Sequence, residues 1–92
     1  MERNFIKQVG RVRKITEKIE IEREGKPNII KRTFTFLAND GQKHYPEIRN
    51  AKIGLLDYIQ EGDKVEILFI LQGTEKNDKR YNNILINSIR KI

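Results

Sequence analysis

Three basic side chains, an aromatic ring and two amides follow one another in the last quarter of the chain: Lys76, Lys79, Arg80, Tyr81, Asn82 and Asn83. A cation beside an aromatic ring suits a backbone phosphate next to an unstacked base. The two amides could hydrogen-bond base edges or sugar, although one of them could equally bond the backbone at the start of a strand. This segment is therefore the first candidate for contact with a nucleotide chain.

The segment lies at the bend of a long hairpin that the sequence predicts over residues 61–92. Apolar side chains alternate along the outgoing arm, as in a strand with one buried face: Val65, Ile67, Phe69 and Leu71. Ile84 and Ile86 alternate again on the return arm. Between the arms, residues 73–79 supply the glycine, asparagine and aspartate that chain reversals use. The hairpin is expected to present the charges, the ring and the amides at its tip.

Aromatic side chains elsewhere could stack on further bases. The candidates are Tyr45, Tyr81 and one of Phe34 or Phe36. A base stacked on an aromatic face gains about 1 to 3 kcal/mol whatever its identity, which is what sequence-independent binding needs. Phe34 and Phe36 alternate with threonines, which favours the core, whereas the polar neighbours of Tyr45 and Tyr81 favour the surface.

Basic side chains that could meet phosphate are spread along the chain: Arg11, Arg13, Lys14, Lys31, Arg32, Lys43, Arg49, Lys79 and Arg80. About half of them should touch a ligand, because cations on the wrong face cannot reach a shared groove. Arg11 and Arg13 share a strand face, and Lys31 and Lys43 could project from neighbouring strands. The site that we predict consists of Arg11, Arg13, Lys31, Lys43, Tyr45, Arg49, Lys76, Lys79, Arg80, Tyr81, Asn82 and Asn83.

Length and charge limit the possible functions. The chain has 92 residues, too few to divide its apolar side chains between two stable cores, so one domain over residues 1–92 is expected. Nineteen Lys and Arg against 13 Asp and Glu give a net charge of +6. This excess favours a polyanion as partner, because each neutralised phosphate releases condensed counterions. A similar excess also occurs in small domains that merely stay soluble.

Other classes of function find little support in the residues. The chain has no cysteine and its only histidine is His44, so neither a usual zinc site nor a disulfide can form, and His44 is expected at an exposed strand position. No glycine-rich phosphate loop or Ser-His-Asp set is present, so we predict no enzyme, cofactor or small-molecule substrate. No segment reaches the roughly 18 apolar residues of a membrane span, and a soluble cytoplasmic protein is expected.

The first half of the chain predicts two strands joined by a turn. Residues 5–24 are extended, and Gly10 marks a bulge or a sharp coil within them. Residues 25–28 form the turn, and residues 29–38 return as a second strand with both phenylalanines on one face.

A third strand and one helix complete the pattern. Residues 39–41 contain Asp-Gly, a strong reversal signal, and residues 43–49 follow as a short strand that Pro46 confines to an edge or ends. Residues 50–60 predict an α-helix, with Asn50 as its cap and an apolar stripe of Ile53, Leu56 and Ile59.

The resulting order is three strands, a helix and two strands. Five short antiparallel strands closed into a barrel, with one helix capping an end, describe the OB-fold, an all-β Greek-key barrel that removes exposed sheet edges. We therefore predict a five-stranded OB-fold with its helix between the third and fourth strands. Other small barrels, such as the SH3-like type, remain possible at this point.

A family resemblance lies in residues 45–46, 55–69 and 79–92, with the glycine-containing stretch at 9–12. In these residues the chain resembles small single-domain OB-fold proteins of the single-stranded DNA-binding type from bacteria and their phages. The resemblance implies sequence-independent binding of single-stranded DNA in replication, recombination or repair. The strand would lie across the barrel face of the second and third strands, between the two long hairpins. Members of this group often carry tryptophan in the third and fifth strands. This chain has none, so stacking would fall to Tyr and Phe.

Two alternatives stay open. An RNA-binding OB module would leave the same pattern, because recognition of the 2′-hydroxyl requires no recognisable motif. A protein-interaction subunit is suggested by Leu68 and Ile70, which make the fourth strand apolar on its second face as well. Self-association would cover that face without a foreign partner, so a homo-oligomer is expected.

Overall fold

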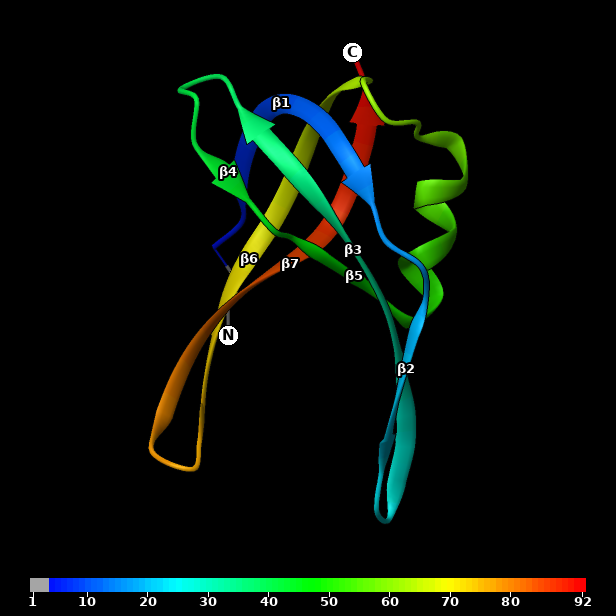
Figure 1. Ribbon diagram of the computed structural model, residues 1–92, viewed down its shortest axis with the longest axis vertical. Helices are drawn as coiled ribbons and strands as arrows, with labels where there is room; N and C mark the ends of the chain where they lie inside the picture. Colours follow the sequence, from blue (N-terminus) through cyan, green and yellow to red (C-terminus); the bar gives the residue numbers. More distant parts are fainter. Residues whose placement is uncertain (1–3) are drawn as a thin grey trace.

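The computed structural model describes residues 4–92, which form a closed β-barrel with one short helix (Figure 1). The strands are β1 (Ile6–Ile15), β2 (Ile19–Arg23), β3 (Lys26–Ala38), β4 (Lys43–His44), β5 (Glu47–Arg49), β6 (Lys64–Lys76) and β7 (Lys79–Lys91). The helix, η1, spans Asn50–Tyr58 and lies between β5 and β6.

The order of the strands confirms the predicted five-stranded OB-fold. β1 and β2 form the first strand of the barrel and β4 and β5 the third, each with a short interruption, while β3, β6 and β7 supply the others. β1 pairs with both β3 and β6, β6 pairs with β7, and β5 pairs with β3, all antiparallel. A single parallel pairing of Glu47 with Leu85 joins β5 to β7 and completes the ring.

Gly10 allows β1 to pair with two neighbouring strands, β3 and β6. In Figure 1, β1 arches over the barrel, and Gly10 pairs with Ala38 of β3 on one side and with Val65 of β6 on the other. A Cβ atom on Gly10 would lie 2.3 Å from the carbonyl oxygen of Leu37 and 2.7 Å from the ring of Phe36. The predicted bend at Gly10 is confirmed, and its cause is the close approach of the β3 backbone.

The core fills the barrel with alternate residues of β1, β3 and β6, together with residues of β5, β7 and η1. Val12, Phe34, Phe36, Ile48, Val65 and Ile67 are each at most 1% exposed. Both phenylalanines therefore belong to the core, as their alternation with threonines indicated, and neither can stack on a base.

The helix differs from the predicted α-helix, because η1 is a 3₁₀-helix. Ile53, Leu56 and Ile59 are buried at a spacing of three, which matches the three residues per turn of that helix. Asn50 does not cap it: the residue has a positive φ of 53°, and its side-chain oxygen accepts a hydrogen bond from the Ile30 amide of β3 at 3.2 Å. The helix start is thus tied to β3 and not to its own first turn.

The long hairpin of β6 and β7 is confirmed, but its turn and one core residue were placed wrongly. The turn consists only of Asn77 and Asp78, both with positive φ, and Gly73 lies within β6. Leu71 is 59% exposed, because β6 and β7 extend beyond the barrel as a two-stranded arm. A register shift beside Leu68 and Phe69 lets Ile86 and Ile89, three residues apart, both face the core.

The remaining turns agree with the pattern except in one boundary. The first hairpin turns at residues 24–25, so that residues 26–28 belong to β3 and not to the turn. Pro46 separates β4 from β5, but the third strand neither ends there nor lies at an edge as expected, because it resumes at Glu47 and pairs with both β3 and β7. Asp63 closes the turn before β6: its carboxylate accepts a hydrogen bond from the Gln60 amide at 2.8 Å, which lowers the pKa of Asp63. Within residues 4–92, no helix is long and apolar enough to cross a membrane.

Replacing Gly10 by alanine should destabilise the barrel by about 1 to 3 kcal/mol, because the added methyl group must displace the β3 backbone. Urea unfolding followed by circular dichroism measures this change. Gly54→Ala in η1 is the matched control, since its new methyl group would come no closer than 4.0 Å to another side chain. Equal stability of the two variants would contradict this account of β1.

Candidate nucleic-acid interface

The pairing of β3 with β4 and β5 brings predicted site residues onto one outward surface of the barrel. Because Phe34 and Phe36 point inward, Lys31, Thr33, Thr35 and Leu37 point outward by strand alternation. Across the ladder, Lys31 pairs with Arg49, Thr33 with Glu47, and Leu37 with Lys43. We call this outward side of β3, β4 and β5, with the adjoining outward residues of β1, the front face.

β1 extends the front face on the other side of β3. Arg11 pairs with Leu37, and the neighbouring Gly10 and Val12 are buried, so the side chain of Arg11 points outward. Arg13 is exposed two residues farther along the strand. The Arg11 guanidinium also donates a hydrogen bond to the carbonyl of Gly62 at 3.1 Å, which anchors it beside the start of β6.

A pocket of about 200 Å³ joins the third strand to the return arm of the long hairpin. Lys43, Tyr45, Asn82 and Asn83 all line it, together with His44. Tyr45 is 67% exposed and projects from the interruption between β4 and β5. The structure therefore brings together four predicted site residues from segments nearly 40 positions apart in the sequence: 43 and 45 with 82 and 83. His44 is half-buried and not exposed as expected, because it pairs with Phe36.

The tip of the β6–β7 arm does not gather its side chains on one face. Strand alternation puts Lys79 and Tyr81 on one side of the ribbon and Arg80 and Asn82 on the other. Arg80 also lies 3.7 Å from Glu75 across the ladder, although both side chains are highly exposed and the pair is weak. Lys76 and Lys79 flank the two-residue turn as neighbours in the ladder.

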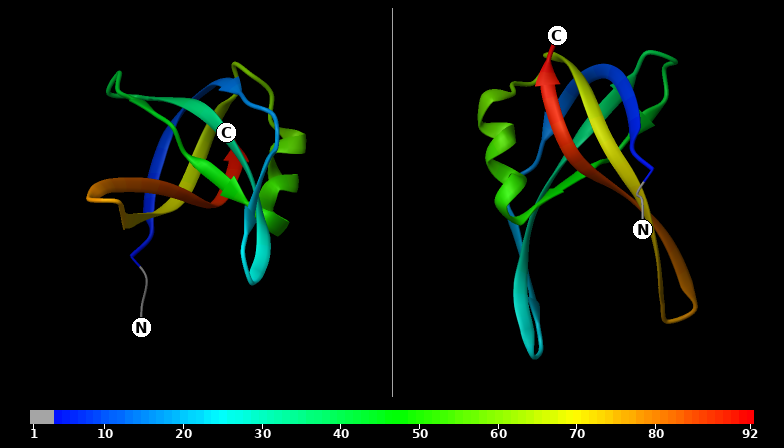
Figure 2. Two further views of the ribbon diagram at one scale, coloured as in Figure 1. Left: turned by 60° about the horizontal axis from the view of Figure 1, so that its bottom comes forward. Right: turned by 180° about the vertical axis from the view of Figure 1, so that it is seen from behind.

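Two hairpin arms frame the space beside the front face. Figure 1 shows the β2–β3 arm and the β6–β7 arm leaving the same end of the barrel, with β5 crossing between them, and Figure 2 shows the same arrangement from behind. An extended polymer lying across β3 and β5 would therefore pass between two arms.

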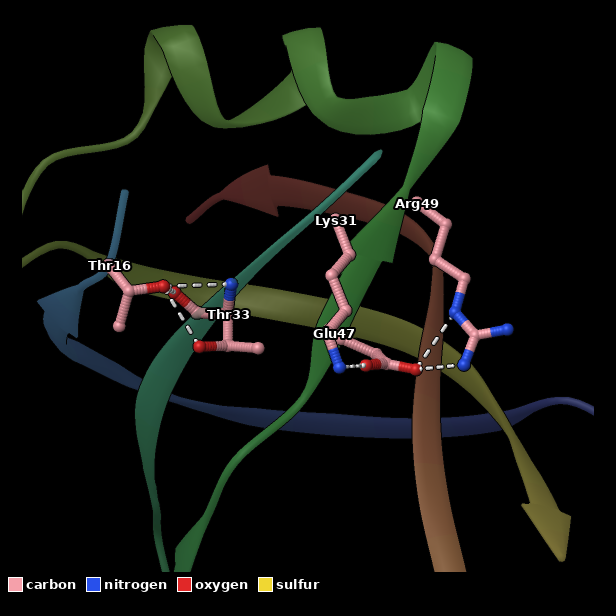
Figure 3. A network of polar contacts seen from close by, with 5 residues as sticks. All are labelled: Thr16, Lys31, Thr33, Glu47 and Arg49. Atoms are coloured by element: carbon pink, nitrogen blue, oxygen red, sulfur yellow. Dashed lines mark hydrogen bonds and ion pairs between the residues drawn. The ribbon is translucent and has the colours of Figure 1, made fainter. Parts of the chain in front are cut away.

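Glu47 holds two of the predicted cations, as Figure 3 shows. The carboxylate is 6% exposed, and one of its oxygens lies 3.3 Å from the Lys31 ammonium. Its other oxygen accepts two hydrogen bonds from Arg49, one of them from Nε at 2.9 Å. The sequence analysis missed Glu47. Its spacing of two residues from Arg49 was a usable signal, because such residues share a strand face, but the partnership with Lys31 depends on the register of β3 and β5.

Further polar contacts fix the side of the front face where the first strand is interrupted. The Thr16 and Thr33 hydroxyl oxygens lie 2.9 Å apart, and the Thr33 amide donates to the Thr16 hydroxyl at 3.1 Å (Figure 3). Arg32 donates from Nε to the Thr16 carbonyl at 2.6 Å. Arg32 pairs with the buried Ile48, so its side chain points away from the front face, where it stabilises the fold.

The chain matches no protein-family model and no curated protein sequence. Solved structures do resemble it over its full length, with low sequence identity. The mitochondrial single-stranded DNA binding protein Rim1 from S. cerevisiae has a TM-score of 0.67 and 14% identity, covering 99% of this chain and 97% of Rim1. The small single-stranded DNA-binding protein from Streptomyces coelicolor has a TM-score of 0.54 and 9% identity, covering 100% and 96%.

A third similar structure is the dimeric N-terminal domain of PriB from Thermoanaerobacter tencongensis. Its TM-score is 0.56 at 16% identity, and the match covers 97% of this chain and 96% of that domain. The structure is thus similar over its full length to OB-fold single-stranded DNA-binding proteins. At these identities, the similarity establishes the fold.

Removing Arg49 should test the role of the Glu47 contacts in stability. Arg49→Met leaves a buried carboxylate oxygen without its two donors and should lower the free energy of unfolding by about 1 to 3 kcal/mol. Arg90→Met is the control, because Arg90 pairs with Glu66 while 72% exposed, and solvent screens such a pair so that its loss should change stability little. Chemical denaturation of both variants gives the comparison; a smaller loss for Arg49→Met than for Arg90→Met would contradict the structural role of the contact.

Proposed function

We propose that this protein binds single-stranded DNA without sequence preference and acts in replication, recombination or repair. The observation that carries the proposal is that exposed Tyr45 lines a pocket with Lys43 beside the front face, which has outward cations on β1, β3, β4 and β5. A ring that is free to stack, set among positive charges, binds the two features common to all unpaired nucleotides. The similar solved structures, two of which are described as single-stranded DNA-binding proteins, support the same conclusion.

In this proposal the strand crosses the front face between the two hairpin arms. Tyr45 stacks on a base, while Lys43 and the arginines of β1 contact phosphates on either side of it. Asn82 and Asn83 line the same pocket as Tyr45 and can donate hydrogen bonds to base edges or sugar. Tyr81 and the lysines of the arm tip would add contacts where the strand leaves the barrel. Binding involves no covalent step.

We further propose that the protein self-associates through the outward side of β1, β6 and β7. Val9, Leu68, Ile70 and Leu85 are half-buried there, and Phe5 is 48% exposed. Phe5, Ile70 and Leu85 border a hollow of about 330 Å³ that Glu47 and Arg49 also line, so this surface adjoins the front face there. Glu66 and Arg90 beside these residues already neutralise each other at 3.0 Å. Lys7, which pairs with Leu68 on the same side, has no ion-pair partner among residues 4–92, so a second copy would have to leave it in solvent or meet it with an acidic group. The PriB domain, described as dimeric, supports this arrangement.

Tyr45→Ala should weaken binding to labelled oligothymidine by roughly 5- to 150-fold, the equivalent of about 1 to 3 kcal/mol of lost stacking. The loss should be similar for oligomers of different sequence. Fluorescence anisotropy titrations at two salt concentrations measure it. Tyr58→Ala is the matched control, because Tyr58 is 79% exposed but lies on η1, outside the front face.

The same titration is repeated with duplex DNA and with an RNA oligomer of matched sequence. Weaker binding to duplex is expected, because paired bases cannot stack on Tyr45. Affinity should fall as salt rises, with a slope of about 0.7 per phosphate contacted. Preference for the RNA oligomer would favour the RNA-binding alternative, and a salt-insensitive complex or equal losses for Tyr45→Ala and Tyr58→Ala would contradict the proposal.

Ile70→Lys should convert an oligomer into a monomer, because it places a charge in the centre of the proposed self-association surface. Size-exclusion chromatography with light scattering gives the mass in solution. Leu71→Lys is the matched control: it changes the neighbouring residue of the same strand, which is 59% exposed and faces the opposite side. A wild-type protein that is monomeric at all concentrations tested would contradict the proposed self-association.

A further inference from the structure

Glu47 occupies an unusual place for a carboxylate. It lies on the front face between Tyr45 and Arg49, on the track that a nucleic-acid strand would follow. A negative charge at this position opposes the binding of phosphate. Its side chain is nevertheless 7% exposed and held by two cations, so it belongs to the packed structure and not to the solvated surface.

The contacts of Glu47 use both of its oxygens. Lys31 pairs with one oxygen and Arg49 donates twice to the other. Together, the two cations and one carboxylate carry a net charge of one positive unit. The side chains of Lys31 and Arg49 remain 27% and 30% exposed. Their unused N–H groups can still reach a ligand. With the charge of Glu47 included, however, the group carries one positive unit, half of the two that Lys31 and Arg49 would carry alone.

We infer that Lys31 and Arg49 form a phosphate-binding position that Glu47 holds partly closed, as an internal competitor of the nucleic-acid backbone. This inference rests on the proposed function and specifies how the same site is regulated. A phosphate that docks on this pair must share its donors with the Glu47 carboxylate. The position therefore releases fewer counterions on binding than two free cations would.

The other cations of the front face differ from Lys31 and Arg49 because no carboxylate pairs with them. Lys43 lies on the same face and has no ion-pair partner among residues 4–92, so its full charge is open to a phosphate. Arg11 and Arg13 of β1 likewise have no ion-pair partner among residues 4–92, so the front face contains three available cations beside two restrained ones. A strand would be held firmly near Tyr45 and Lys43 and more weakly near Glu47, which favours release of that part of the strand.

Glu47→Gln tests the inference with the same shape and one negative charge fewer. Binding of labelled oligothymidine should tighten roughly threefold or more at low salt, and the salt slope should rise by about 0.7 to 1.4, the contribution of one or two additional phosphates. Glu66→Gln is the control, because it raises the net charge by the same amount but releases Arg90, and both residues lie on β6 and β7 outside the front face. Anisotropy titrations over a series of salt concentrations measure both quantities.

The outcomes separate the possible causes. A gain for Glu47→Gln well above that for Glu66→Gln supports the inference. Equal gains would show an effect of net charge alone, and weaker binding by folded Glu47→Gln would show that the carboxylate orients the cations for the ligand; either result overturns it. Thermal unfolding of each variant, followed by circular dichroism, confirms that a folded protein is being compared.

A second pair of variants keeps the inference testable if Glu47→Gln does not fold. Lys43→Met should lower the salt slope by about 0.7, whereas Lys31→Met should lower it by clearly less, because Glu47 already neutralises part of that charge. Equal losses would overturn the inference. Inorganic polyphosphate serves as a second probe: if no variant binds oligothymidine but Glu47→Gln binds polyphosphate more tightly, the proposed function fails and the inference stands. No binding of either probe by any variant would overturn both.

Discussion

The barrel depends on a single strand that must pair with two neighbours. β1 contacts β6 with its first half and β3 with its second, and the handover takes place at Gly10, where the β3 backbone leaves no room for a side chain. Without this close approach the ring would stay open beside β1, and Arg11 and Arg13 would not lie next to the outward residues of β3. The front face is thus a consequence of how the barrel closes, because β1 lies beside β3 only across that junction.

Charge on such a surface cannot be counted from the sequence alone. Of the outward basic residues, Lys31 and Arg49 are restrained by Glu47, and Arg11 is anchored to the Gly62 carbonyl without losing its charge. A hydrogen bond to a carbonyl fixes a cation in place, whereas an ion pair also neutralises it. Both arrangements order a long side chain before a ligand arrives. Only the ion pair lowers the electrostatic gain on binding.

Strand positions were predictable because alternation is a local property. The period of two placed Phe34, Phe36, Val65 and Ile67 in the core, and Gly10 marked the bend, since each signal lies within a few residues. The errors concern non-local effects. Leu71 continues the apolar alternation but extends past the end of the barrel. Asn50 resembles a helix cap, yet the Ile30 amide of β3 takes its side-chain oxygen. For the site, residue types were readable, whereas the partnership of Glu47 with Lys31 required the register between two strands.

Fold similarity and the argument for function rest on different residues. The similar solved structures share 9% to 16% identity with this chain, so the similarity concerns the course of the backbone. One backbone fold serves proteins that bind many different ligands. The case for nucleic acid comes instead from what this chain places on the framework. The ring of Tyr45 is exposed where the third strand is interrupted, and Lys43 and two asparagines of the return arm line the same pocket. Pro46 has no amide hydrogen to donate, so the backbone there keeps only the hydrogen bond that its carbonyl accepts from the Phe34 amide at 3.3 Å, and the regular ladder is interrupted beside Tyr45.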